Sequence, residues 1–216
     1  MARVRGLGVA APVRRRSIIV AVVVAATVLL SACEYAGLGS TPVALFGDSV
    51  ADDAATETAA EMEADYRYVG RFARAGAIQD QLLPLALQLQ ADPPDILIVE
   101  LGVGDAQLWH DDARMRDDIV RVLDAASDIG CVRWPNLKTA GVNPFYQGVV
   151  ARSGAFNQIL AEVIAGYPNA EMIDYDIWAQ ARPGYYLADG LHFNPEGRAA
   201  YGNWLRTRVA GSCRRR

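Results

Sequence analysis

The sequence predicts an α/β fold, in which one sheet of parallel strands carries helices on both faces. Short apolar runs typical of buried strands alternate with longer segments of helical periodicity along most of the chain. Parallel strands need crossover connections of about a dozen residues or more, which the helical segments supply. Of the 216 residues 52% are hydrophobic, which is enough for the core of one domain and leaves little room for a second.

The first expected strand, residues 43–46, is apolar and ends in a tight turn, and the Ala- and Glu-rich segment that follows predicts a helix. Residues 96–101 form the most strand-like run, because they are apolar apart from Glu100. Gly70 and Gly76 bracket an expected loop. In chain order, we expect strands at residues 43–46, 66–69, 96–101, 137–142 and 170–174, and helices at residues 51–64, 78–90, 111–128, 154–165 and 196–209.

The N-terminal segment, residues 1–32, predicts a signal peptide that is not part of the fold. Three consecutive arginines precede an apolar run at residues 18–30, and Leu-Ser-Ala-Cys, ending in Cys33, follows. The apolar run is shorter than the roughly 20 residues of a membrane span. The Leu-Ser-Ala-Cys motif at residues 30–33 resembles the lipobox of bacterial lipoproteins. This resemblance implies cleavage before Cys33 and lipidation of its thiol.

Such a protein would be exported and anchored as a lipoprotein on the outer face of the cytoplasmic membrane. An ordinary cleaved signal peptide, which would give a secreted protein, and an uncleaved anchor stay open as alternatives. Residues 33–41 are expected to form a tether, and residues 42–216 the folded domain.

The chain has three cysteines, and export would place them in an oxidising compartment. With Cys33 lipidated, Cys131 and Cys213 remain as a pair that could form a disulfide. Two separate buried thiols are the alternative.

The charge and the spacing of polar residues exclude several classes of partner. The formal net charge is −4 at pH 7, and residues 1–32 contain arginines but no acid, so the expected mature domain is more acidic still. An acidic domain argues against nucleic acid as a partner. No Cys/His spacing suggests a metal site, and the stretch Gly102-Val103-Gly104 is too short for a dinucleotide fingerprint. We therefore expect neither a metal nor an organic cofactor.

The turn after the first strand, Gly47-Asp48-Ser49, places a serine at the carboxyl end of a parallel strand. Open α/β sheets bind their ligands at this edge, and the N-terminus of the following helix directs N–H groups toward whatever Ser49 attacks. Ser49 acting only as a helix cap is the alternative interpretation.

A second motif, Asp189-Gly190-Leu191-His192, lies near the end of the chain, in a loop before the last expected helix. A serine nucleophile needs a base, and the base needs a carboxylate that orients it. Ser49, His192 and Asp189 could supply these three groups. Taken alone, the second motif also fits a His/Asp pair in a surface turn.

Together, the two motifs make the chain resemble the SGNH or GDSL family of serine hydrolases over about residues 43–210. The resemblance implies a flavodoxin-like three-layer α/β/α sandwich with about five parallel strands. It also implies that Ser49 is the nucleophile, that His192 is the general base and that Asp189 orients this base, without a cofactor.

The oxyanion hole is where the sequence departs from this family. The family builds the hole from the N–H of the serine, a glycine N–H and the asparagine of a Gly-x-Asn-Asp block. Gly76 matches the glycine, Gly70 is a weaker match, and the third block is Gly-Val-Gly-Asp here, so that Gly104 stands in place of the asparagine. Loss of one oxyanion donor typically lowers turnover by about 10²–10³. Asn143, expected at the end of the next strand, or a water molecule could replace the missing amide.

The residues and the resemblance predict a serine esterase that hydrolyses acyl or acetyl esters through an acyl-enzyme. Its expected substrate is a small-molecule, glycan or lipid ester, and its expected membrane contact is the lipid anchor. Two other interpretations stay open. Gly104 allows an SGNH-fold binding lipoprotein with weak or no catalysis, and the same three residues would also serve an acyltransferase.

Residues outside these motifs have less specific interpretations. Asp105 is expected to brace its turn, and His110 to lie on the surface. The acids of the first helix, Asp53 among them, are most simply a solvated helix face. Tyr185 and Tyr186 could form the wall of an acyl pocket or pack in the core.

Overall fold

The structure, a computed structural model, describes residues 41–209, which form a five-stranded sheet flanked by helices. Neighbouring strands are parallel throughout, in the order β2-β1-β3-β4-β5. The strands are β1 (Pro42–Gly47), β2 (Arg67–Ala73), β3 (Ile96–Glu100), β4 (Cys131–Pro135) and β5 (Ala170–Ile173). The predicted α/β fold class is therefore confirmed.

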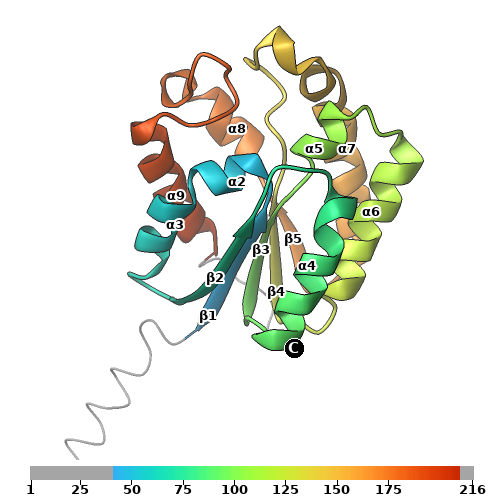
Figure 1. Cartoon of the computed structure of the whole chain (residues 1–216), viewed down its shortest axis with the longest axis vertical. Helices are drawn as coiled ribbons and strands as arrows, with labels where there is room; N and C mark the ends of the chain where they lie inside the picture. The colour runs from blue at the N-terminus through green and yellow to red at the C-terminus, as the bar shows by residue number, and fades with distance from the viewer. Residues whose placement is uncertain (1–40, 210–216) are drawn as a thin grey trace, which may run out of the picture. The chain divides into compact units, whose positions relative to one another are not determined.

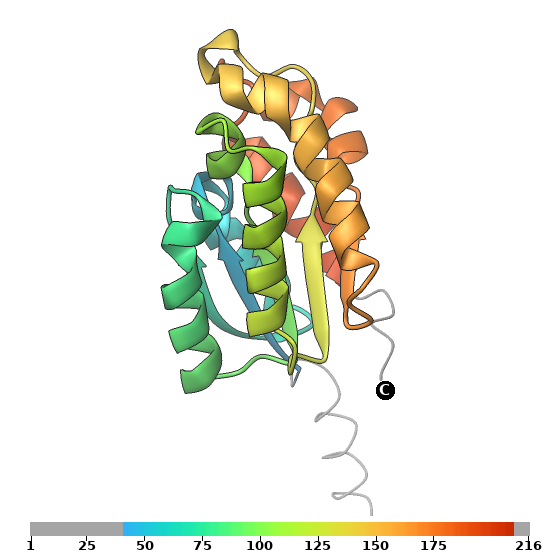
Figure 2. The same cartoon turned by 90° about the vertical axis from the view of Figure 1, so that its right-hand side faces the viewer.

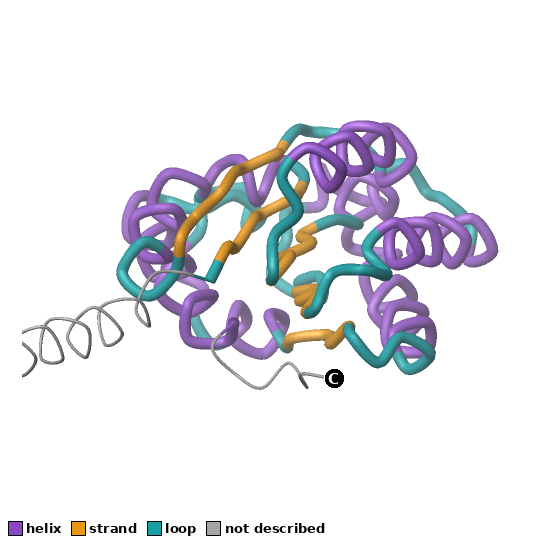
Figure 3. The backbone as a smooth tube through the Cα atoms, turned by 90° about the horizontal axis from the view of Figure 1, so that it is seen from below, coloured by secondary structure: helices purple, strands orange, loops and turns teal. Residues whose placement is uncertain are grey.

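Helices form a layer on each face of the sheet, as the view along the strands in Figure 3 shows. One layer consists of α4, α6 and α7, which lie side by side in front of the strands in Figure 2. The other contains α2, α3, α8 and α9 (Figure 1). The helices are α2 (Ser49–Asp53), α3 (Ala55–Met62), α4 (Ile78–Ala91), α5 (Val103–Gln107), α6 (Asp112–Ala125), α7 (Gln147–Ile164), α8 (Tyr175–Gln180) and α9 (Pro195–Val209), with 3-10 turns η1 (Pro144–Tyr146) and η2 (Pro183–Tyr185).

Strand β1, which lies between β2 and β3, is apolar on both faces because each face is covered by helices. Val43 and Leu45 belong to the core cluster on the side of α9, whereas Ala44 and Phe46 belong to the cluster on the side of α4, α6 and α7. All four side chains are buried. Such a continuous apolar run is typical of a central strand in a parallel sheet, which is why residues 43–46 were recognisable as a strand from the sequence.

The carboxyl ends of β1 and β3 bring the segments of the site together. Gly47 pairs with Glu100 in the register of these two strands, and the Asp48 N–H donates to the Glu100 carbonyl oxygen at 2.9 Å. The chain leaves β1 into α2 and leaves β3 into α5. The first residues of both helices therefore lie at one edge of the sheet.

The predicted fourth strand, residues 137–142, is wrong: β4 is Cys131–Pro135, and residues 137–142 lie in the connection to η1. The true strand contains an arginine and a proline, which made it look unlike a buried strand. Arg133 is 1% exposed, and its guanidinium pairs with the Glu171 carboxylate on the neighbouring strand β5. An ion pair across two strands allows a charge in the sheet that the sequence pattern alone does not predict.

Several other boundaries also differ from the prediction. The helix expected at 51–64 begins at Ser49 and is divided at Ala54 into α2 and α3. Strand β2 continues to Ala73, so that Gly70 lies inside it and pairs with Ala44 rather than opening a loop. Helix α7 begins at Gln147, before the expected residue 154.

The predicted signal peptide, Cys33 and Cys213 lie outside the described residues, as does the tether apart from residue 41. Cys131 is buried at the start of β4, and its disulfide with Cys213 stays a prediction. Within residues 41–209, no helix combines the length and the apolar character that crossing a membrane requires.

Candidate active site

Ser49 is the first residue of α2, and the preceding residue caps this helix. The Asp48 carboxylate accepts the Val50 N–H through Oδ1 at 3.1 Å and the Val103 N–H through Oδ2 at 3.1 Å. One buried side chain thus joins the exits of β1 and β3. Since Asp48 is the cap, the alternative in which Ser49 only caps the helix is wrong.

Gly47 is required because the turn is tight. A Cβ atom there would lie 2.3 Å from the Ala51 Cβ and 2.9 Å from the Glu100 carbonyl oxygen. The close approach lets the serine follow the strand immediately, at the start of a helix.

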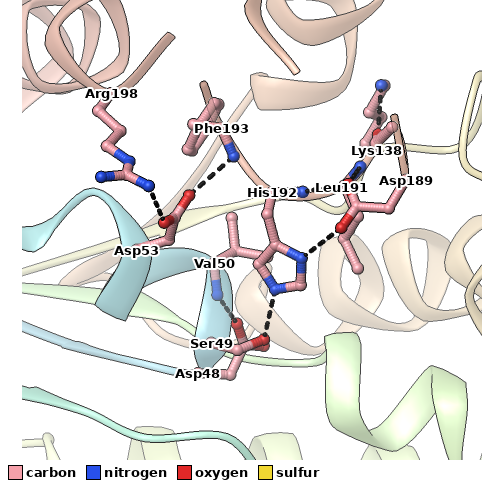
Figure 4. A network of polar contacts seen from close by, with 11 residues as sticks. Asp48, Ser49, Val50, Asp53, Lys138, Asp189, Leu191, His192, Phe193 and Arg198 are labelled. Carbon is pink, nitrogen blue, oxygen red and sulfur yellow. Dashed lines mark hydrogen bonds and ion pairs between the residues drawn. The ribbon is translucent and has the colours of Figure 1, made fainter. Parts of the chain in front are cut away.

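Ser49, His192 and Asp189 form a hydrogen-bonded chain at this edge of the sheet (Figure 4). The Ser49 Oγ lies 3.2 Å from His192 Nε2, and His192 Nδ1 lies 2.8 Å from Asp189 Oδ2. The histidine and aspartate side chains are 23% and 26% exposed. The interpretation of the second motif as an isolated pair in a surface turn is therefore wrong, because His192 contacts a serine 143 positions away in the sequence.

Asp189 is held as a carboxylate by the loop around it. Burial raises the pKa of Asp189, but hydrogen bonds from the His192 ring and from the backbone N–H groups of Leu191 and His192 outweigh this effect and keep the pKa below its usual value. An ionised Asp189 that accepts from Nδ1 leaves Nε2 of a neutral His192 free to accept a proton from Ser49.

A lysine side chain and a backbone N–H fix the loop of Asp189. The Lys138 Nζ donates to the Gly190 carbonyl oxygen at 2.7 Å and lies 3.6 Å from the centre of the Tyr186 ring. The Asn143 N–H donates to the Asp189 carbonyl oxygen at 2.8 Å, and the Asn143 side chain accepts the N–H of Phe145 to cap η1. These contacts place Asn143 beside the loop that carries Asp189. The role of Asn143 as an oxyanion donor stays a prediction.

Asp53 joins the serine's helix to the histidine's loop, a role that sequence reasoning missed. Its Oδ2 accepts the Phe193 N–H at 2.8 Å, and its Oδ1 lies 2.8 Å from the Arg198 guanidinium on α9 (Figure 4). The side chain is 17% exposed, so the interpretation of Asp53 as part of a solvated helix face is wrong. Nothing in a run of acids on a short helix distinguishes the one that turns inward.

The two oxyanion glycines named from the sequence, Gly76 and Gly104, lie against each other. A Cβ atom on Gly104 would lie 2.1 Å from the Gly76 carbonyl oxygen and 2.8 Å from the Ala77 nitrogen. The peptide between Gly76 and Ala77 therefore occupies the space that any side chain at position 104 would need. Gly76 has a φ of 147°, which favours glycine. The loop that contains Gly76 therefore leaves no room for a side chain at position 104, where the resemblance expects an asparagine.

A pair of buried acids lies beneath Ser49. Burial raises the pKa of Asp48 to about 7, against the effect of its backbone hydrogen bonds. Burial and the neighbouring Asp48 raise the pKa of Glu100 to about 8, and the Tyr201 hydroxyl donates to Glu100 Oε2 at 2.6 Å. The two carboxyl groups repel each other when both are ionised, so that the pair retains a proton near neutral pH.

The remaining candidates are distributed between core and rim. His110 is buried and hydrogen-bonded to Asp105, so the prediction that it lies on the surface is wrong. Tyr186 is buried and shares a hydrogen bond of 3.0 Å with the Tyr175 hydroxyl, which favours packing over a role in an acyl pocket. The sequence analysis did not name Tyr146, and the centre of its ring lies 6.2 Å from the centre of the His192 ring.

The fold is the α/β sandwich that the SGNH/GDSL resemblance implies. A sequence model of the GDSL-like lipase/acylhydrolase family matches residues 36–200, and the chain therefore belongs to this family. Members of the family act on ester bonds. A search of curated protein sequences found no match.

Solved structures with a similar fold include several enzymes. The lipase/acylhydrolase from Enterococcus faecalis is 21% identical, with a TM-score of 0.63 over 82% of this chain and 99% of that chain. A catalytic mutant of an acetylxylan esterase from Geobacillus stearothermophilus is 10% identical, with a TM-score of 0.64 over 83% and 99%. The C-terminal catalytic domain of peptidoglycan O-acetyltransferase A from Streptococcus pneumoniae is 16% identical, with a TM-score of 0.58 over 81% and 92%. At these identities, the likeness shows a shared fold.

Restoring the family's asparagine should harm this protein. We expect Gly104→Asn to lower the free energy of unfolding by about 1–3 kcal/mol, because the new side chain displaces the backbone at Gly76. Turnover should fall as well, since the Gly76 N–H, an expected oxyanion donor, lies on the adjoining peptide and would be displaced with it. Urea unfolding and esterase assays measure both effects. The matched control is Gly154→Ala in α7, where no atom lies within 4 Å of the added Cβ and where alanine should be neutral or stabilising. Higher turnover in a stable Gly104→Asn variant would contradict this account of the loop.

The buried acid Glu100 predicts a pH-dependent stability. Because the folded chain binds the Glu100 proton more tightly than the unfolded chain, the free energy of unfolding falls as the pH rises from about 4.5 toward about 8. Glu100→Gln removes this loss. The free energy of unfolding of the variant minus that of the wild type should therefore increase over this interval by at least about 1.4 kcal/mol, the equivalent of one pKa unit.

Urea unfolding at several pH values across this interval measures the difference. Glu63→Gln, at an exposed position after α3, is the control and should run parallel to the wild type. A Glu100→Gln profile that also runs parallel to the wild type would show that folding does not raise the pKa of Glu100.

Proposed function

We propose that the protein is a serine esterase that hydrolyses acyl or acetyl esters through an acyl-enzyme on Ser49. The observation that carries the proposal is the continuous hydrogen-bonded chain from Ser49 through His192 to Asp189 at the carboxyl edge of a parallel sheet. Membership of a family of ester-acting enzymes supports the reaction class.

In the first half of the reaction, the Ser49 Oγ attacks the ester carbonyl carbon while His192 Nε2 takes the hydroxyl proton. Asp189 stabilises the imidazolium through Nδ1–H. The backbone N–H groups of Ser49 and Gly76 are the proposed donors to the oxyanion of the tetrahedral intermediate. When the intermediate collapses, His192 returns the proton to the leaving alcohol, and the acyl group stays on Ser49.

In the second half, His192 takes a proton from water, the resulting hydroxide attacks the acyl carbonyl carbon, and the carboxylic acid leaves as Ser49 regains its proton. The contacts of Asp53, Lys138 and Asn143 keep the serine and the histidine loop in place during both steps. Groups that are held in position before the substrate binds do not need to reorganise during the reaction.

An acyltransferase is the second candidate, because a sugar hydroxyl in place of water uses the same residues. The similarity in fold to the catalytic domain of a peptidoglycan O-acetyltransferase supports this second candidate. The products formed from an ester donor with and without a sugar acceptor would separate the two reactions. An SGNH-fold binding lipoprotein without catalysis is a third candidate, and the glycine at position 104 is its support.

We also propose that the protein is exported and anchored by a lipid on Cys33 to the outer face of the cytoplasmic membrane. The supporting observation is the basic, apolar and Leu-Ser-Ala-Cys order of residues 1–33. The substrate would then be a glycan or lipid ester of the cell envelope. A disulfide between Cys131 and Cys213 is consistent with this oxidising location.

The reactivity of Ser49 can be tested with a fluorophosphonate probe on the full chain purified in detergent. We expect the wild type to be labelled, Ser49→Ala to remain unlabelled, and His192→Ala to be labelled at least about 10³-fold more slowly. Ser127→Ala, which changes an exposed serine in the turn after α6, is the control and should be labelled at the wild-type rate. A folded wild type that is not labelled would overturn the esterase proposal and favour the binding lipoprotein.

A further inference from the structure

A second group of buried polar residues lies apart from Ser49 and His192, where α5 turns into α6. It consists of Asp105 on α5, His110 in the connection and Asp118 on α6, which are 0%, 7% and 3% exposed. One nitrogen or oxygen atom from each of the three side chains lies within 4.8 Å of the other two. Nothing in the proposed ester chemistry uses this group.

Asp105 and His110 are already oriented toward each other. The His110 Nδ1 lies 3.0 Å from Asp105 Oδ1, and the His110 N–H donates to the Asp105 carbonyl oxygen at 3.1 Å. The other carboxylate oxygen of Asp105 accepts the Ile78 N–H at 3.0 Å, at the start of α4. The cluster therefore contacts the segment that follows Gly76 and Ala77.

Asp118 brings a second carboxylate to the cluster without compensation by hydrogen bonds. Its Oδ2 is enclosed and has no hydrogen-bond partner among residues 41–209. Arg114 Nε and Arg121 Nη1 form ion pairs with its two carboxylate oxygens at 3.8 Å and 3.6 Å, which balance part of its charge but lie beyond hydrogen-bonding distance, and both arginines are about half exposed. A buried carboxylate oxygen without a hydrogen bond is costly, and a bound cation at close range would satisfy it better than these two exposed arginines do.

We propose that Asp105, His110 and Asp118 bind one divalent first-row transition-metal ion, such as Zn²⁺ or Mn²⁺. Two carboxylates and one imidazole are ligands that these ions accept, whereas Ca²⁺ and Mg²⁺ prefer oxygen ligands alone. The ion would place positive charge between two buried carboxyl groups and bind the Asp118 oxygen that has no hydrogen bond. Its role is structural, because it joins α5, the middle of α6 and, through Asp105, the first residue of α4.

The chain needs only small movements to close around an ion. A tetrahedral ion with bonds of about 2.1 Å holds its donor atoms about 3.4 Å apart, so donor atoms that now lie up to 4.8 Å apart would need to move by only about 1 Å. The sequence showed no metal site because the ligands are spaced five and eight positions apart on different elements, unlike a paired Cys/His motif.

The chain's two histidines make the assignment testable, because an imidazole ligand is either His110 or His192. The full chain is purified in detergent without a polyhistidine tag, stripped with EDTA and titrated with ZnCl₂ or MnCl₂ in a calorimeter. We expect saturable binding of one ion in the wild type and in His192→Ala. His110→Asn and Asp118→Asn should each weaken binding by at least about 100-fold. Asp117→Asn, which removes the neighbouring exposed carboxylate on α6, should bind as the wild type does.

A wild-type readout keeps the test independent of how the variants fold. Co²⁺ added to the stripped chain should produce the visible absorption bands of a four- or five-coordinate site, and Zn²⁺ should displace them. Failure of the wild type to bind one ion of Zn²⁺ or Mn²⁺, or unchanged affinity in folded Asp118→Asn and His110→Asn, would overturn the proposal. Neither result depends on Ser49 being reactive, so the metal site and the proposed esterase function stand or fall separately.

Discussion

The candidate active site depends on the Asp53 carboxylate, which connects the helix that begins with Ser49 to the loop that carries His192. The contact between the reacting groups is a single hydrogen bond of 3.2 Å, whose net contribution to stability is only about 1 kcal/mol. It cannot by itself hold two segments that lie 143 positions apart in the sequence. Asp53 accepts the N–H of the residue after His192 and pairs with Arg198 on the next helix, and hydrogen bonds to a charged group are among the stronger ones.

Comparable contacts hold the other two sides of the site. Asp48 connects the exits of β1 and β3, and Lys138 fixes the carbonyl group next to Asp189. Each of these side chains bonds to backbone N–H or C=O groups of a different segment, so that the loops are positioned by the sheet edge as a whole. The raised pKa of Asp48 is the consequence of placing such a connection in the interior, where burial disfavours the charged form.

The structure gives a steric reason for the glycine at position 104. The sequence alone indicates only that the asparagine donor of the oxyanion hole is missing there. In the structure, the Gly76 carbonyl oxygen approaches so closely that position 104 cannot carry a side chain, and Asp105 holds the adjacent segment through the Ile78 N–H. The glycine and the closed loop are therefore two parts of one arrangement, in which backbone N–H groups are the expected oxyanion donors.

The sequence predicted the fold class and the three residues of the hydrogen-bonded chain because these follow from local patterns: apolar runs, turn residues and two short motifs. It failed where a long-range partner decides the outcome. Strand β4 was missed because Arg133 is compensated by Glu171 on another strand. Asp53 was placed on the surface because nothing within its own helix shows that Phe193 faces it. His110 differs, because its partner Asp105 is only five positions away, but the sequence does not show that helices α4 and α6 bury this turn. Such partners are set by packing and become visible only in three dimensions.

The central claim is that Ser49 and His192 are held together before the substrate binds, and the rate of fluorophosphonate labelling in Asp53 variants tests it most directly. Asp53→Ala leaves the Phe193 N–H without its acceptor, and labelling should slow by about 10- to 100-fold. Asp53→Asn keeps an oxygen that can accept this N–H, so its labelling rate should lie between that of the wild type and that of Asp53→Ala. Wild-type labelling rates in both folded variants would contradict the account, because the site would then not depend on this contact.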